Sequence, residues 1–147
     1  MGCNGRVTLP SLVMSKPVIQ LSELLRSLRP SLNPGVYVFA MVPPGTDFGS
    51  IEPIATFREA EGLTIIADEE QARRAGLRAL FRAAWIPLTV HSDLQAVGLT
   101  AAVAAALAQA QISCNVVAAA FHDHLFVPIE SAEQALDALA MLQQRHS

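Results

Sequence analysis

The stretch VHSDLQAVGLTAAVAAALAQA, from Val90 to Ala110, decides the expected fold because it ends one strand and begins one helix. The apolar run that leads into it, from Trp85 to His91, is typical of a strand. Its second part is rich in alanine, the residue with the highest helix propensity. The stretch therefore predicts a strand, a short polar loop around Ser92, and a helix that ends near Ala110.

The residues that follow extend this pattern to the end of the sequence. ISCNVVAAAFHDHLFV, from Ile112 to Val127, carries β-branched and aromatic residues in two runs, which predicts two strands. Ser131 and Gln134 predict a capping box at the start of a last helix. The expected order is β-α-β-β-α, and such a unit needs a fourth strand. We expect the N-terminal half to supply it.

The N-terminal half alternates helical and strand patterns more weakly. Leucines at helical spacing predict a short amphipathic helix over residues 21–28, which Pro30 ends. Three strands are expected next, at residues 35–42, 54–58 and 63–67, and Asp68 is expected to cap a helix over 69–75 that ends at Gly76. We predict a loose extension over residues 1–15 and two units, 16–80 and 81–147.

Composition excludes several classes of protein. The 147 residues are 52% hydrophobic and 16% charged, with a net charge of −3, which excludes a disordered chain and gives no general attraction to nucleic acid or an anionic membrane. The longest apolar run, 97–110, is shorter than the roughly 20 residues that cross a bilayer. Cys3 and Cys114 are too far apart for a disulfide framework, which favours a cytoplasmic protein.

Val90 to Ala110, followed by Ile112 to Val127, resembles the core of an ACT domain, and Tyr37–Val42 with Thr56–Ala67 resembles a diverged second unit. The resemblance implies a tandem of ferredoxin-like βαββαβ units. This is an α+β fold, an antiparallel sheet with helices on one face. It also implies a non-catalytic regulatory module that binds an amino acid or a similar metabolite, as in aspartokinase. It brings no catalytic residue and no cofactor.

A ligand site is predicted where the loop enters the alanine-rich helix. The first N–H groups of a helix lack partners and carry partial positive charge, so they can hold a carboxylate. Asp93 can pair with an ammonium group, and Asn115 offers a donor and an acceptor. The predicted ligand-binding set is Ser92, Asp93, Val97, Gly98, Leu99, Asn115 and Val116. A second interpretation stays open, in which Ser92 and Gln95 form an ordinary capping box and Gly98 packs on the sheet.

One cluster of the sequence has residue types that bind metals: His122, Asp123 and His124. The resemblance places them at the hairpin between two strands, where Asp supports a tight turn. Zinc needs three or four converging ligands, so no metal site is predicted. Alternation leaves both faces of the strand at 112–121 apolar. Helices can cover one face, and the second suggests another sheet or another subunit, so we predict a homodimer.

Two other functions remain as alternatives to ligand sensing. The first is an interaction module whose pocket is closed by Val97 and Leu99. The second is a small enzyme that uses Asp93 with His91.

Overall fold

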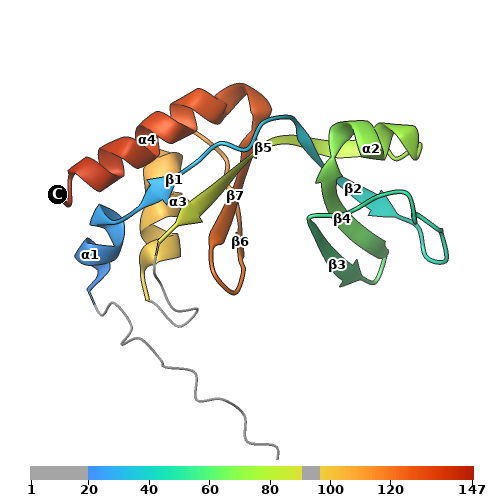
Figure 1. Cartoon of the computed structure of the whole chain (residues 1–147), viewed down its shortest axis with the longest axis horizontal. Coiled ribbons are helices and arrows are strands. Elements are labelled where there is room, and N and C mark those ends of the chain that lie inside the picture. Colours follow the sequence, from blue (N-terminus) through green and yellow to red (C-terminus); the bar gives the residue numbers. More distant parts are fainter. Residues whose placement is uncertain (1–19, 91–96) are drawn as a thin grey trace, which may run out of the picture.

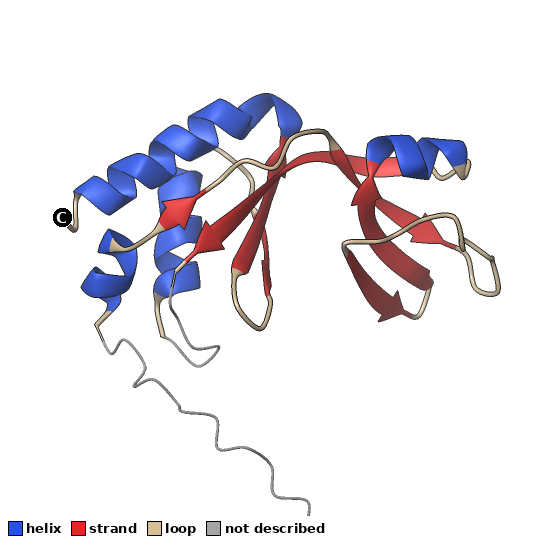
Figure 2. Cartoon of the chain, viewed as in Figure 1, coloured by secondary structure: helices blue, strands red, loops and turns tan. Residues whose placement is uncertain are grey.

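The computed structural model describes residues 20–90 and 97–147, so the expected N-terminal extension lies outside the described residues. The elements, in chain order, are α1 (Leu21–Arg26), β1 (Arg29–Pro30), β2 (Tyr37–Val42), β3 (Ala55–Glu59), β4 (Gly62–Asp68), α2 (Glu69–Arg74), β5 (Ala79–Thr89), α3 (Leu99–Gln109), β6 (Asn115–Ala118), β7 (Asp123–Pro128), the 3-10 turn η1 (Ile129–Ser131) and α4 (Ala132–Gln144). Figure 2 shows helices and strands mixed along the chain, as expected for an α+β fold.

The strands form one antiparallel sheet in the order β3-β4-β2-β5-β7-β6, with β1 also paired to β5. The long strand β5 belongs to both halves of the sheet. On one edge it pairs with β2 at Ala83 and with β1 at Leu88. On its other edge it pairs with β7 over the whole interval from Ala83 to Leu88. The sheet bends into an arch around this strand (Figure 1).

Each half of the sheet has the strand order of a ferredoxin-like unit. The C-terminal half reads β1-β5-β7-β6, and its fourth strand, β1, comes from the N-terminal part of the chain as expected. The N-terminal half reads β3-β4-β2-β5. In this half residues 43–54 form a loop where the resemblance predicts a helix, because Pro43, Pro44 and Gly45 interrupt helical hydrogen bonding. Ile51 of this loop is buried against the sheet.

Within residues 20–90 and 97–147, the four α-helices lie on one face of the sheet, which confirms the expected arrangement. Side chains of α1, α3 and α4, including Leu25, Leu107 and Leu139, bury with Ile86 and Leu125 of the sheet. Helix α2 contacts β2, β4 and β5 of the other half. Burying a leucine of this kind stabilises the folded state by roughly 1.5–3 kcal/mol, so the helix-covered face supplies most of the core.

The opposite, concave face is closed in part by the sheet's own curl. Phe39, Ile66, Ala83 and Phe126 are buried there, and the Phe39 ring lies 5.5 Å from the Phe126 ring. Sequence alternation predicted that this second apolar face needs another layer or another subunit. Part of that layer is the other half of the same sheet.

Of three local predictions, one is confirmed by the structure and two are wrong. Asp68 caps α2 as predicted, because its side chain accepts hydrogen bonds from the N–H groups of Glu70 and Gln71. The capping box at Ser131 is wrong: a 3-10 turn precedes α4, and Ser131 makes no side-chain cap hydrogen bond. Asp123 is not a turn residue. The hairpin closes through Ala119 N–H to the His122 carbonyl, 3.0 Å, and Asp123 already belongs to β7.

Candidate functional site

The predicted ligand site is described only in part. His91, Ser92 and Asp93 lie outside the described residues. Val97 is 89% exposed, whereas Leu99 points into the core. The capping-box pair Ser92 and Gln95 also lies outside the described residues. The N-cap of α3 is Gly98.

Gly98 needs to be glycine for two reasons. Its φ of 97° lies in the left-handed region that L side chains avoid. A Cβ added at this position would also lie 3.1 Å from Leu21 Cδ2, so α1 is packed directly against the entrance of α3. No described side chain caps α3, and its first turn holds no acidic residue. Its first backbone N–H groups therefore remain without a side-chain partner among the described residues.

Asn115 and Val116 lie away from this entrance. Asn115 begins β6 and pairs with Phe126, which pairs in turn with Trp85 in the middle of β5. The chain leaves β5 only after Thr89, at the other end of the strand. Val116 packs partly on the helix-covered core. Within one chain, the structure does not bring these two residues beside Gly98.

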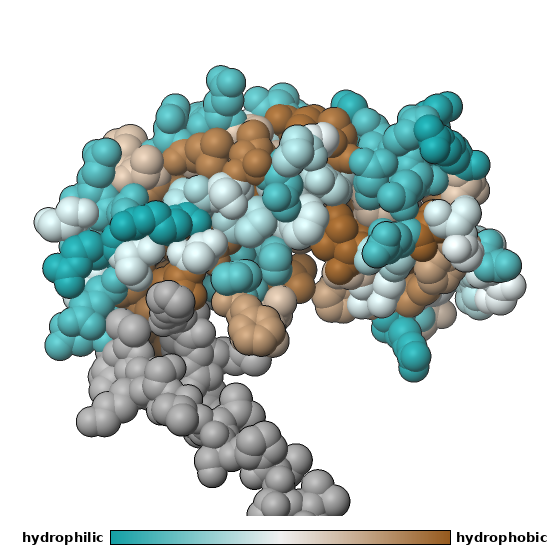
Figure 3. Space-filling view, in the orientation of Figure 1, coloured by the Kyte–Doolittle hydropathy of each residue, from teal (hydrophilic) through white to brown (hydrophobic). Residues whose placement is uncertain are grey.

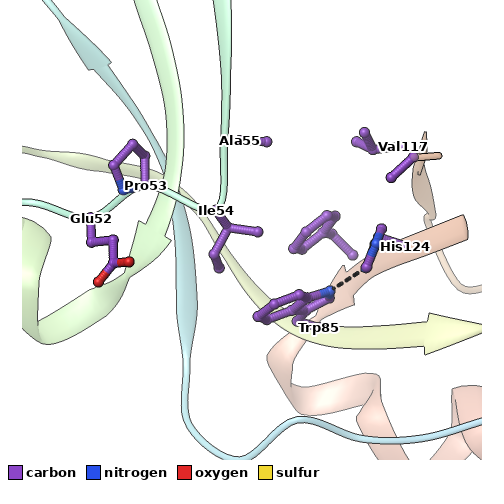
Figure 4. Close-up of a pocket in the computed structure, with 9 residues that line it drawn as sticks. Glu52, Pro53, Ile54, Ala55, Trp85, Val117 and His124 are labelled. Carbon is purple, nitrogen blue, oxygen red and sulfur yellow. Dashed lines mark hydrogen bonds between the residues drawn. The ribbon is translucent and has the colours of Figure 1, made fainter. Parts of the chain in front are cut away.

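The concave face carries a cleft that the sequence did not predict. Its volume is about 400 Å³, and the surface is hollowed between the two halves of the molecule, with hydrophobic side chains around the hollow (Figure 3). We call it the concave cleft; its lining includes Glu52, Ile54, Ala55, Trp85, Val117, His124 and Phe126. Ile54 ends the loop before β3 and Ala55 begins that strand, and Trp85 and His124 face them from β5 and β7 (Figure 4).

A hydrogen bond from Trp85 fixes the tautomer of His124 in this wall of the cleft. Trp85 Nε1–H donates to His124 Nδ1 over 2.9 Å. Because the indole nitrogen can only donate, Nδ1 carries no proton, and the neutral imidazole keeps its proton on Nε2. Burial lowers the pKa of His124, and the nearby His122 lowers it further. The neutral tautomer is therefore the stable one at neutral pH.

Aromatic rings support the same wall from several sides. The Trp85 and Phe126 rings are stacked, with centroids 6.3 Å apart and planes 17° apart. Tyr37 meets Trp85 edge-on at 5.2 Å. Such contacts restrict the rings, so this wall is already ordered without a ligand.

The sequence held a signal for this cleft in the alternation of β7. Residues two apart on a strand share a face, so His124 and Phe126 point to the same side. Pairing of Phe126 with Trp85 then places all three together. The signal was missed because His124 was assigned to a hairpin rather than to a strand.

The described residues show neither a cluster of metal ligands nor a membrane-spanning helix. Within 20–90 and 97–147, no three His, Cys, Asp or Glu side chains gather as metal ligands. Cys114 is half-buried, and burial raises the pKa of its thiol to about 11, which makes it a poor nucleophile. No helix in this same part of the chain is long and apolar enough to cross a bilayer.

Comparison with known proteins identifies the two halves. Two family models described as ACT domain match residues 17–84 and 81–140. A Vibrio cholerae protein of unknown function is 51% identical, with a TM-score of 0.76, over 84% of this chain and 95% of that one. No match was found among the curated proteins.

Two more distant structures show the fold alone. The regulatory subunit of aspartate kinase from Thermus thermophilus is 14% identical, with a TM-score of 0.61, over 77% of this chain and 95% of that one. An Agrobacterium tumefaciens protein is 18% identical, with a TM-score of 0.60, over 79% and 89%.

Proposed function

The chain belongs to the ACT-domain family, and from that premise we propose that it is a non-catalytic regulatory module that binds an amino acid or a similar small metabolite. The observation that carries the proposal is the entrance of α3. Its N-cap is a left-handed glycine, and no described side chain occupies its first N–H groups. These groups are suited to a ligand carboxylate, which they can hold without a basic residue.

We propose that the other residues of the predicted ligand-binding set make the remaining contacts with the ligand. Ser92 and Asp93 precede α3 in the sequence, and we propose that Asp93 pairs with the ligand ammonium group. Asn115 and Val116 lie at the far end of β6, so in this proposal they contact a ligand held by a second copy of the chain. The proposed homodimer follows from this placement.

A thermal-shift screen of the twenty amino acids against the full chain tests the proposal. A ligand that binds only the folded state raises the melting temperature, by an amount that grows with its concentration over Kd. We expect one L-amino acid to raise it and its D-form to have no effect. Asp93→Ala should abolish the shift, whereas Asp137→Ala, an exposed acidic residue on α4, should keep it. No shift with any amino acid would contradict amino-acid sensing.

A protein-interaction module is the second candidate, and one contact favours it. Leu21 lies against Gly98, so the entrance of α3 is partly covered by the chain's own α1. In such a module the entrance is covered because it no longer serves a ligand. The amino-acid screen should then stay silent both in the wild-type protein and in Leu21→Ala, where the covering side chain is removed, and the function would lie in the surface. The third alternative, an enzyme using Asp93 with His91, rests on residues outside the described part.

Exposed apolar side chains on the concave face support the proposed homodimer. Phe57 and Met41 are exposed, and strand alternation puts Phe57 on the concave face with Ala55. Covering such apolar side chains favours association. Light scattering should give the mass of two chains at micromolar concentration, and Phe57→Ser should lower the measured mass toward that of one chain.

We propose that the protein is cytoplasmic, and we assign the boundary between the two ACT units to residues 80–81.

A further inference from the structure

We propose that the concave cleft is a second small-molecule site, separate from the α3 entrance, and that it binds a flat, uncharged aromatic molecule carrying a carbonyl acceptor. Nothing in the ACT assignment supplies this site. It follows from the size, lining and hydrogen-bonding state of the cleft.

Size and lining limit the ligand to a small apolar ring. The volume of about 400 Å³ lies near the lower end of the range for small-molecule sites, roughly 300–1,000 Å³. Ile54 and Ala55 form one wall, and the Trp85 indole belongs to the other (Figure 4). A flat ring between these walls can take an offset or edge-on position against Trp85, the geometry that aromatic pairs prefer.

The carbonyl requirement comes from His124. Its Nδ1 is already occupied by the Trp85 N–H, so its Nε2 is a donor. In the part of the chain that the structure describes, Nε2 has no hydrogen-bond partner, and no side-chain nitrogen without a partner is buried. This N–H therefore stays accessible and is free to donate to a ligand oxygen.

The requirement for an uncharged ligand comes from the side chains that line the cleft. Among the described residues that line it, Glu52 is the one acidic side chain, and there is no lysine or arginine. A carboxylate ligand would meet a neutral imidazole and a negative rim without a compensating cation. A neutral amide satisfies His124 through its oxygen, and its N–H groups are compatible with the Glu52 carboxylate.

Trp85 is the only tryptophan of the chain, so its fluorescence reports directly on the cleft. We would titrate the full-length protein with benzamide at concentrations on the order of 1–10 mM, the range suited to so small a ligand. Saturable change of the Trp85 emission is the expected result. Cyclohexanecarboxamide has the same carbonyl without a flat ring, and benzoate has the flat ring with a negative charge. Both should bind about tenfold more weakly or not at all.

Two substitutions assign the binding to this cleft. His124→Asn keeps an acceptor for the Trp85 N–H, but its shorter side chain cannot place an N–H where Nε2 lies, so benzamide should bind about three- to tenfold more weakly. His122→Asn, two residues away and exposed on the hairpin, is the matched control and should leave binding unchanged. Ala55→Leu fills the cleft from β3 and leaves the Trp85 side chain itself unchanged. It should abolish benzamide binding.

Circular dichroism and the melting temperature establish that each variant is folded. No saturable emission change in the wild-type protein would overturn the proposal. So would equal binding of cyclohexanecarboxamide, or unchanged binding in folded Ala55→Leu. Asp93→Ala should leave benzamide binding intact, so this outcome is independent of the amino-acid screen.

Discussion

The Trp85–His124 hydrogen bond makes stability depend on pH in a defined direction. Burial lowers the pKa of His124 below the ordinary value of about 6.5, as does the neighbouring His122. Below that ordinary value the unfolded chain therefore binds more protons than the folded chain, and stability falls as pH falls. We expect the melting temperature to drop between about pH 7 and pH 5.5, together with a change in Trp85 emission.

Substitutions distinguish the contribution of His124 to the pH dependence of stability from those of the other titrating groups. His124→Asn cannot protonate, so its melting temperature should vary less over this interval. His122→Asn should keep most of the wild-type slope. Asp123 has a pKa raised by burial, so its contribution to stability has the opposite sign and grows as pH falls. An unchanged slope in His124→Asn would contradict the assignment.

Gly98, at the start of α3, is predicted to be costlier to replace than Gly76, which follows α2. A left-handed conformation costs an L residue roughly 1–2 kcal/mol, and Gly98→Ala also brings Cβ against Leu21. Gly76→Ala has comparable strain, with a φ of 71°, but open space around the added carbon. Urea denaturation should therefore show a larger loss for Gly98→Ala. The excess should disappear when Leu21→Ala is added, and equal losses at both glycines would contradict the contact.

At the scale of elements, local patterns predicted those segments whose structure is set by neighbours in sequence. Asp68 caps α2 because its partners lie two and three residues away. The first half of β5 was missed, since the run from Ala79 to Arg82 has no clear alternation and is held as a strand by pairing with β2. For the concave cleft, alternation in β7 places only His124 and Phe126 on one face. The rest of its lining could not be predicted locally, because β3, β5, β6 and β7 meet there only through folding of the sheet.

The segment α1–β1 is predicted to hold the C-terminal unit together. Leu28 is fully buried in the core shared with α3 and α4, and Pro30 pairs with Leu88 of β5. Leu28→Ala should reduce the free energy of unfolding by about 2–5 kcal/mol. Leu32 follows β1 and is 43% exposed, so Leu32→Ala is the matched control and should change it by less than about 0.5 kcal/mol. Similar losses in guanidinium titrations would contradict this role.

For the molecule as a whole, β5 joins the two units more tightly than a linker would. Its first half completes the sheet of the N-terminal unit, and its second half is central to the C-terminal unit. The concave face adds contacts between the halves, since Phe39 of β2 meets Phe126 of β7. Unfolding one unit would break the strand and expose the aromatic cluster of the other.

We therefore predict one cooperative unfolding transition for the whole chain. Ile65 is buried in the N-terminal core and Leu125 in the C-terminal core. Each change to alanine should lower the midpoint of the same transition, by about 2–5 kcal/mol of stability, whether it is followed by far-UV circular dichroism or by Trp85 emission. Coincidence of the two probes is the test of a two-state transition. Two steps in circular dichroism, with Ile65→Ala moving only the first, would show that the units unfold separately and that the shared strand does not couple them.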